Sequence, residues 1–369
     1  MGAPNIRVAH VLGSLIYGGV QTTGLNLVRG LAKLSFRQLV VYQVSNAGDM
    51  YSEFASLTEV LHCPYQKDGC LRFVRALSRL LREKSVDVVL SHSFGNHALI
   101  AIAARLAGVP KTYVIVTGDP ASRSRHFLPR LALAHSARPV CEGEIAVSES
   151  VGRALLDRLR LPARRVTVIP NGCDVEHVAR RALGARAAAG RGPGWRVLMA
   201  GRMGRPKDHP TLLRAVALLR AKSHPVELIL AGDGNERAEH EALARRLGIS
   251  DCVHFLGTRP DIPELMGTSD VLVLATGNEG LPIVVLEGMA AEIPIIATDI
   301  PPCREALDGG RCGMLVPPRD PHGLAAAMEN TLRDPRQSDE LVRAASQRVR
   351  DHYDLPLMAE RYAELLRRV

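Results

Sequence analysis

The chain has 369 residues, which is too long for one ordinary hydrophobic core and predicts two domains. Hydrophobic residues make up 46% and charged residues 23%, as in a soluble globular protein, and no apolar run of about 18 residues is present to span a membrane. The formal net charge of +9 lies in residues 1–170, where 21 Lys and Arg face 11 Asp and Glu, so that +10 falls there and −1 in the rest.

The basic first half has two readings. It suits an anionic membrane surface or an acidic acceptor, and it is equally what an arginine-rich codon bias produces. The seven cysteines are odd in number and form no Cys-x-x-Cys pair, which argues against a disulfide framework and a zinc site. No signal-peptide pattern opens the chain. We therefore expect a cytoplasmic protein, with peripheral contact at the inner face of the membrane left open and no nucleic-acid partner.

Alternating apolar strands and amphipathic helices predict a doubly wound parallel sheet in the first half. The first strand, residues 6–12, leads into a glycine-rich turn with Gly18 and Gly19. Such a turn lets a ligand approach the backbone, but its spacing is not the dinucleotide pattern G-x-G-x-x-G, so an ordinary tight turn is the alternative. Further strands are predicted at residues 38–44, 86–90, 111–116, 144–147 and 166–171, and helices at 71–84 and 98–107.

Polar side chains follow three of these strands, at the edge where a parallel sheet gathers ligand-binding loops. They are Ser91, His92, Ser93 and Asn96, then Thr117, Gly118 and Asp119, then Ser148 and Glu149. His92 and His97 do not have zinc-protease spacing, so no metal role is expected. The basic segment 121–139 is either a plain surface helix or a helix that docks on a membrane or an acceptor.

A second run of strands and helices begins at Trp195, after a glycine-rich stretch at residues 170–194 that we assign to the domain linker. Arg202 and Lys207 lie between its first strand and a helix that begins near Pro210. Two cations ahead of a helix suit a diphosphate, although standing alone they would be solvated loop charges. The strands are predicted at residues 195–200, 227–231, 253–256, 271–274 and 294–297.

Two acids eight positions apart stand in this half, Glu279 in the loop after a buried strand and Glu287 about two turns inside the next helix. Gly280, beside the helix start, offers backbone N–H groups and a partial positive charge that suit an anion or a hydroxyl-rich ligand. Taken alone, the acids fit equally well a solvated loop acid and a helix-surface acid. Toward the C-terminus, helices are predicted at 323–332, 337–351 and 355–369.

Motifs spread over nearly the whole chain resemble those of the retaining glycosyltransferases of family four, which have the GT-B fold. They are GGVQTTGLNLVRGLA at 18–32, VIPNG at 168–172, GRMGRPKDHPTLLRA at 201–215, LAGDGNER at 230–237, FLG at 255–257, EGLPIVVLE at 279–287 and LVPPRD at 315–320. The resemblance implies two Rossmann-like doubly wound parallel-sheet domains facing a central cleft. Residues 1–170 with the helix 355–369 would bind the acceptor, and residues 171–354 the nucleotide sugar.

By that resemblance the donor is a nucleoside-diphosphate sugar, with UDP favoured over GDP, and neither a metal nor another cofactor is required. Arg202 and Lys207 would neutralise the departing diphosphate, Glu279 would bind the donor sugar and Glu287 the ribose. Closure of the two domains would exclude water. Backbone contacts to the donor would come from Gly18, Gly19, Gly280, Leu281 and Ile283.

One departure from the family pattern concerns a histidine that members commonly carry after the strand 111–116, where this chain has Gly118. Either Asp119 or His92 covers its role, or the match is a residue or two out of register, or sugar activation is weaker. The resemblance implies transfer of a hexose-type sugar to a hydroxyl acceptor, with lipid-linked, polysaccharide and secondary-metabolite acceptors all open. The alternatives are a sugar-nucleotide isomerase of the same fold and a non-catalytic sugar-nucleotide binder.

Overall fold

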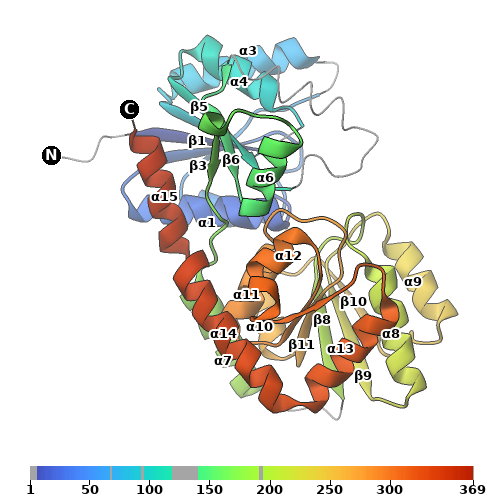
Figure 1. Ribbon diagram of the computed structural model, residues 1–369. Helices are drawn as coiled ribbons and strands as arrows, with labels where there is room; N and C mark the ends of the chain where they lie inside the picture. Colours follow the sequence, from blue (N-terminus) through green and yellow to red (C-terminus); the bar gives the residue numbers. More distant parts are fainter. Residues whose placement is uncertain (1–5, 67–68, 93–94, 119–139, 191–193, 369) are drawn as a thin grey trace. The chain divides into compact units, whose positions relative to one another are not determined.

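The computed structural model describes residues 6–66, 69–92, 95–118, 140–190 and 194–368. The chain divides into two compact units (Figure 1). Unit 1 comprises residues 1–172 and 355–369, and unit 2 comprises residues 173–354.

Unit 1 is built on a parallel sheet of seven strands within the described residues, in the order β3-β2-β1-β4-β5-β6-β7. The order reverses between β1 and β4, which is the switch point of a doubly wound sheet. Strand residues alternate between the two faces, so Val11 packs in the core beneath α3 and α4 while Leu12 packs beneath α1. The strands are β1 (Arg7–Leu12), β2 (Arg37–Tyr42), β3 (Glu59–His62), β4 (Val88–Ser91), β5 (Lys111–Val116), β6 (Gly143–Ala146) and β7 (Val166–Val168).

Helices cover both faces of this sheet, and the last helix of the chain, α15, packs on α1. Gly30 of α1 permits that contact, because a Cβ at this position would lie 2.7 Å from the Cβ of Ala359. The helices of unit 1 are α1 (Gly19–Lys33), α2 (Tyr51–Ala55), α3 (Cys70–Glu83), α4 (His97–Ala107), α6 (Glu149–Asp157) and α15 (Leu355–Arg367), with a 3₁₀ turn η3 (Ala163–Arg165).

Unit 2 repeats the architecture with six parallel strands among its described residues, in the order β10-β9-β8-β11-β12-β13. Its strands are β8 (Trp195–Ala200), β9 (Val226–Ala231), β10 (Val253–Gly257), β11 (Val271–Leu274), β12 (Ile295–Thr298) and β13 (Met314–Val316). Its helices are α7 (Val175–Ala188), α8 (His209–Ala221), α9 (Arg237–Arg246), α10 (Ile262–Gly267), α11 (Ile283–Ala290), α12 (Pro301–Ala306), α13 (Pro321–Arg333) and α14 (Pro335–Tyr353), with a 3₁₀ turn η4 (Asp308–Gly310).

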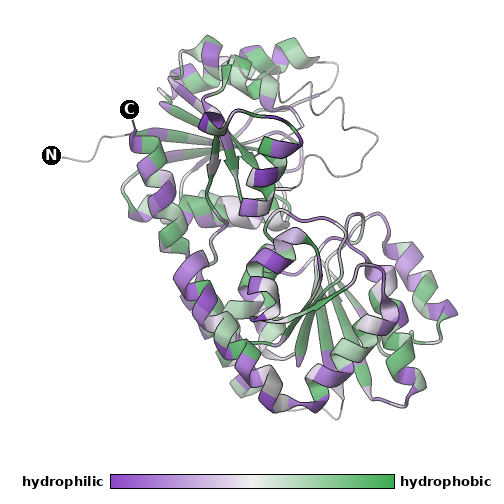
Figure 2. Ribbon diagram, viewed as in Figure 1, coloured by the Kyte–Doolittle hydropathy of each residue, from purple (hydrophilic) through white to green (hydrophobic). Residues whose placement is uncertain are grey.

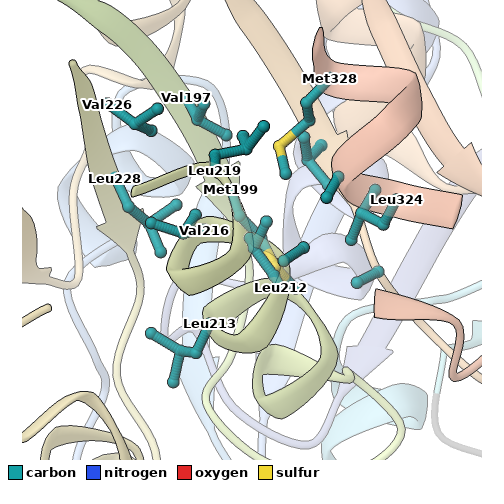
Figure 3. Packing of buried hydrophobic residues seen from close by; sticks show 14 of the residues in the cluster. Val197, Met199, Leu212, Leu213, Val216, Leu219, Val226, Leu228, Leu324 and Met328 are labelled. Atoms are coloured by element: carbon teal, nitrogen blue, oxygen red, sulfur yellow. The ribbon is translucent and has the colours of Figure 1, made fainter. Parts of the chain in front are cut away.

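The core of unit 2 lies between β8, β9 and the pair α8 and α13, as Figure 3 shows. Leu219 of α8 lies beside Val197 of β8, and Leu212 of α8 and Met328 of α13 belong to the same cluster; all four are fully buried. Figure 2 shows the same division along the chain, with apolar strands inside and polar helix surfaces outside. This core fixes the strand ends from which the candidate site is built.

The structure corrects the predicted linker at residues 170–194, because most of it is the helix α7. Alanine has the highest helix propensity, and the Asp174 side chain caps α7 by accepting from the His177 backbone N–H at 3.1 Å. Val178 and Ala182 are buried, and Gly267 of α10 allows the Ala182 carbonyl to approach closely. The buried face of α7 is therefore narrow, with Val175, Val178 and Ala182, and forms no broad apolar stripe in the sequence.

The sequence reading also missed α2, β3 and α6 in unit 1, and α9, α10, α12 and β13 in unit 2. The predicted basic helix at 121–139 lies outside the described residues. All seven cysteines are free thiols. No helix in the described part of the chain has the length and apolar composition needed to cross a membrane.

Candidate active site

The loops after β8 and β11 lie side by side at the carboxyl edge of the unit 2 sheet. The Asp208 backbone N–H donates to the Ala275 carbonyl, and the Gly277 N–H donates to the Pro206 carbonyl, both at 2.9 Å. β8 and β11 are neighbours in the sheet, and the strand order reverses between them. The two loops therefore meet at the switch point, where open α/β sheets bind their ligands.

These loops carry an ion pair between two residues that are 72 positions apart in the chain. Lys207 Nζ lies 2.5 Å from Glu279 Oε1, and the two side chains are 15% and 14% exposed. The next residue, Asp208, caps α8 by accepting from the Thr211 N–H at 3.3 Å, which fixes where the loop ends. The sequence predicted Lys207 and Glu279 in two loops that each follow a strand, and in the structure their charged atoms are in contact.

A close backbone contact braces the loop after β8 from its other side. Gly232, after β9, has φ of +149°, and a Cβ there would lie 2.1 Å from the Gly201 carbonyl oxygen. Only glycine fits this position without displacing the loop. The glycines of LAGDGNER thus have a structural role that holds the Lys207 loop in place.

Arg202, the second predicted cation, is exposed in the same loop, and its Nη2 donates to the Arg205 carbonyl at 3.4 Å. Gly280 and Leu281 are buried, and α11 begins at Ile283. No acidic residue stands in the first turn of α11, and no side chain caps its N-terminus. The positive end of the helix dipole is therefore not neutralised by its own first turn.

Glu287 lies in the second turn of α11, which is shallower than the predicted two turns inside the helix. Burial raises the pKa of its carboxyl to about 7, and the charge of Arg181 on α7 acts in the opposite direction. Arg181 Nε donates to Glu264 Oε1 of α10 at 2.6 Å, so its guanidinium is held in place. The sequence reading missed Arg181 because it assigned α7 to the linker, where no apolar stripe pointed to a helix.

In unit 1, Gly18 is exposed as the N-cap of α1, and Gly19 is the first residue of that helix. His92 follows β4 and is only 4% exposed, with its Nε2 3.2 Å from Nδ1 of the buried His10. Burial, and secondarily the neighbouring His10, lower the pKa of His92 well below its usual value, so the ring is neutral at pH 7. Asp119 lies outside the described residues.

The structure thus assembles Lys207, Glu279 and the start of α11 into one site in unit 2, with Arg202 at its exposed edge. Gly18, Gly19 and His92 belong to unit 1. Among the described residues, no group of three or more His, Cys, Asp and Glu side chains is arranged to hold a metal ion.

Comparison with known proteins decides the family. The profile described as Glycosyltransferase Family 4 matches residues 17–177, and the profile described as Glycosyl transferases group 1 matches residues 187–348. EpsF of Bacillus subtilis (strain 168), a glycosyltransferase by name, is 32% identical over 311 residues, which cover 81% of this chain and 80% of EpsF. The chain is a family 4 glycosyltransferase.

Further relatives of the glycosyltransferase agree in fold and class. The phosphatidyl-myo-inositol mannosyltransferase of Mycolicibacterium smegmatis is 29% identical over 343 residues, covering 90% of this chain and 86% of the relative. The crystal structure of Anabaena HepE in complex with UDP and glucose superposes with a TM-score of 0.86 at 20% identity, covering 99% of this chain and all of HepE. These comparisons, with the two parallel sheets, confirm the predicted GT-B fold.

Proposed function

We propose that this glycosyltransferase moves a hexose-type sugar, of glucose, N-acetylglucosamine or mannose type, from a nucleoside-diphosphate sugar to an acceptor hydroxyl with retention of configuration and without a metal. The observation that carries the proposal is the Lys207–Glu279 pair at the switch point of unit 2, beside the start of α11. HepE has been solved with UDP-glucose, which supports a donor of the UDP class on this fold.

The proposed donor site meets the diphosphate with fixed positive charge. Lys207 supplies an ammonium that is already held in position, and Arg202 is exposed in the same loop with donors free to turn toward phosphate oxygens. The backbone N–H groups at the start of α11, with those of Gly280 and Leu281, add the positive end of a helix dipole. Such preorganised charge stabilises a leaving diphosphate as its negative charge grows.

The ion pair changes partners when the donor binds. Without a donor, Lys207 and Glu279 compensate each other's charge in a site that is largely shielded from water. With a donor, Lys207 turns to a phosphate oxygen, and the Glu279 carboxylate accepts a hydrogen bond from a hydroxyl of the sugar. Glu287, in the second turn of the same helix, is proposed to accept hydrogen bonds from the ribose.

Retention requires that the acceptor attack the face of the sugar from which the diphosphate leaves. The bond between C1 and the phosphate oxygen breaks, a bond from C1 to the acceptor oxygen forms, and the acceptor proton passes to an oxygen of the departing diphosphate. Unit 2 is proposed to hold the donor and unit 1 the acceptor, while Gly18 and Gly19 are proposed to offer backbone contacts to the donor. His92, which is buried in unit 1, and Asp119 stay the two candidates for the role of the histidine that family members commonly carry after β5.

Turnover assays separate this function from its two alternatives. The protein is incubated with UDP-, GDP-, ADP- and TDP-sugars, with and without a panel of sugar and lipid-linked acceptors, and products are resolved by mass spectrometry. We expect release of one nucleoside diphosphate that depends on an acceptor. Conversion of the sugar nucleotide without any acceptor would indicate an isomerase, and binding with no turnover under all conditions would indicate a non-catalytic binder.

For location, we propose a cytoplasmic protein that contacts an anionic membrane surface through α3 and α4. Arg72 and Arg75 are exposed on α3, and the two helices expose Leu71 at 73% and Leu106 at 58%. Cations interleaved with exposed leucines suit an anionic lipid surface. Co-sedimentation with phosphatidylglycerol vesicles, but not with phosphatidylcholine vesicles, is expected and should weaken in Arg72→Gln/Arg75→Gln; equal sedimentation with both lipids would contradict the charge argument.

A further inference from the structure

The loops after β8 and β11 pair with each other in antiparallel fashion, although the strands that lead into them are parallel. An isolated antiparallel bridge joins Lys207 to Thr276. The hydrogen bonds from the Asp208 N–H and the Gly277 N–H, each 2.9 Å long, flank this pair and do not link its two residues directly. In such a non-hydrogen-bonded pair the Cα atoms are about 4.5 Å apart and the side chains leave on the same face. Thr276 therefore lies beside the stem of the Lys207 side chain.

The hydroxyl of Thr276 is buried between the two loops and reaches a carbonyl of each. Thr276 is 1% exposed, and its Oγ1 lies 3.4 Å from the carbonyl oxygens of Pro206 and Asn278. A hydroxyl carries a single hydrogen, so the two carbonyls share it, which agrees with the length of both contacts. Pro206 precedes Lys207, and Asn278 precedes Glu279. One side chain thus holds the peptide before each of the two charged residues.

Thr276 is itself fixed to the sheet through the neighbouring strand β12. Its N–H donates to Oγ1 of Thr298, the last residue of β12, at 3.0 Å, and Thr298 Oγ1 donates to the Leu274 carbonyl at 3.3 Å. Thr298 is 4% exposed, and β11 and β12 are paired strands. The sheet therefore fixes the position of the Thr276 hydroxyl, and both loops are held relative to it.

We propose that Thr276 is a positioning residue of the donor site, which sets the separation between Lys207 and Glu279. Its buried hydroxyl acts through the two loop peptides and does not contact the donor. In the proposed mechanism the ion pair opens when Lys207 turns to a phosphate oxygen, so the ion pair no longer joins the loops at that moment. The backbone bonds and the Thr276 hydroxyl then hold them. This effect on the donor rests on the proposed function, whereas the effect on the ion pair of the unliganded protein does not.

The coupling between Lys207 and Glu279 in urea unfolding tests the positioning without a donor. The cycle of Lys207→Met and Glu279→Gln is measured in the wild type and in the backgrounds Thr276→Val, which keeps the shape and removes the hydroxyl, and Thr276→Ser, which retains it. Thr331→Val is the matched control, because Thr331 is a buried threonine of α13 whose hydroxyl donates to the Met314 sulfur at 3.0 Å. Thr276→Ala replaces the valine variant if the latter does not unfold cooperatively.

We expect the coupling to fall by half or more in Thr276→Val and to stay unchanged in Thr276→Ser and in the Thr331→Val control. An undiminished coupling in the variants that lack the Thr276 hydroxyl, or an equal fall in the control, would overturn the positioning role. Absence of any coupling in the wild type would overturn it as well, since the two charges would then have no separation to maintain.

Titration of UDP extends the test to the donor. Thr276→Val should weaken UDP binding by about three- to tenfold, the loss of one neutral hydrogen bond, and by less than about twofold when Lys207→Met is already present. Thr276→Ser should retain most of the affinity. Equal losses with and without Lys207→Met would mean a general loss of packing and would overturn positioning through Lys207. If UDP does not bind the wild type, the proposed donor site fails, and the unfolding cycle alone decides the role of Thr276.

Discussion

Replacing Lys207 by methionine keeps the length of the side chain and removes the ammonium group that faces Glu279. The Glu279 carboxylate, 14% exposed, would then lie largely out of water without its partner. Breaking a fully buried pair costs about 3–5 kcal/mol, and exposed pairs contribute about 0–1 kcal/mol. Because both side chains keep some contact with solvent, we expect Lys207→Met to lower the free energy of unfolding by about 1–2 kcal/mol.

A double-mutant cycle isolates the pair from other effects of the substitution. Lys207→Met, Glu279→Gln and the double variant are unfolded in urea, and their free energies of unfolding are compared with that of the wild type. The double variant should be more stable than the sum of the single changes predicts, with a coupling energy of about 1–2 kcal/mol. Arg220→Met/Asp251→Asn, an exposed pair at 2.7 Å in the same unit, should couple much more weakly. A coupling below about 0.3 kcal/mol at Lys207 and Glu279 would refute the pairing.

Three further changes test other parts of the structure. Gly232→Ala should lower the free energy of unfolding by about 2–3 kcal/mol or more, because the residue has φ of +149° and its Cβ would meet the Gly201 carbonyl; a change under about 0.5 kcal/mol would contradict this contact. The pKa of His10 is about 4 in the folded state, below its value of about 6.5 in the unfolded chain, so the free energy of unfolding should fall as the pH drops from about 6.5 to 4. Denaturation curves at pH 7 and pH 5 measure this fall. In His10→Gln the free energy of unfolding should fall less between the two pH values. The pKa of Glu287 is shifted in the unfavourable direction at high pH, since its folded value of about 7 exceeds the unfolded value, so ionisation above pH 7 destabilises the fold. Glu287→Gln should therefore be more stable than the wild type at pH 8 and about equally stable near pH 4.5. Equal stability of the two proteins at both pH values would contradict the burial of the Glu287 carboxyl.

The central strands could be predicted from the sequence, because a parallel strand that is buried on both faces is a continuous run of apolar residues. β11 and β12 are such strands, and α13 was placed correctly from Asp320, whose side chain accepts from the Gly323 N–H at 2.9 Å. β3 was missed because an edge strand buries little, and its residues are only partly covered or exposed. α7 was missed because small residues suffice where two helices pack closely.

The candidate site could be predicted in part, because its residues fall into short motifs. Lys207 and Glu279 each occupy a loop that follows a buried strand, and the parallel sheet places those loops at one edge. Their direct contact depends on backbone hydrogen bonds such as that from Asp208 to Ala275, which no residue pattern encodes. Neither the charge of Arg181 acting on Glu287 nor the burial of His92 beside His10 could be predicted, since both follow from packing between distant segments.

The most direct test of the central claim is a calorimetric titration of UDP and UDP-glucose into the wild type, Lys207→Met and Glu279→Gln, in a buffer that contains a metal chelator. Lys207→Met should weaken the binding of both ligands by about 10- to 100-fold, because both carry the diphosphate and the variant loses one charge-assisted hydrogen bond to it. Glu279→Gln should weaken only the sugar nucleotide. If both ligands bind all three proteins equally, the Lys207–Glu279 site does not hold the donor, and the proposed function loses the observation on which it rests.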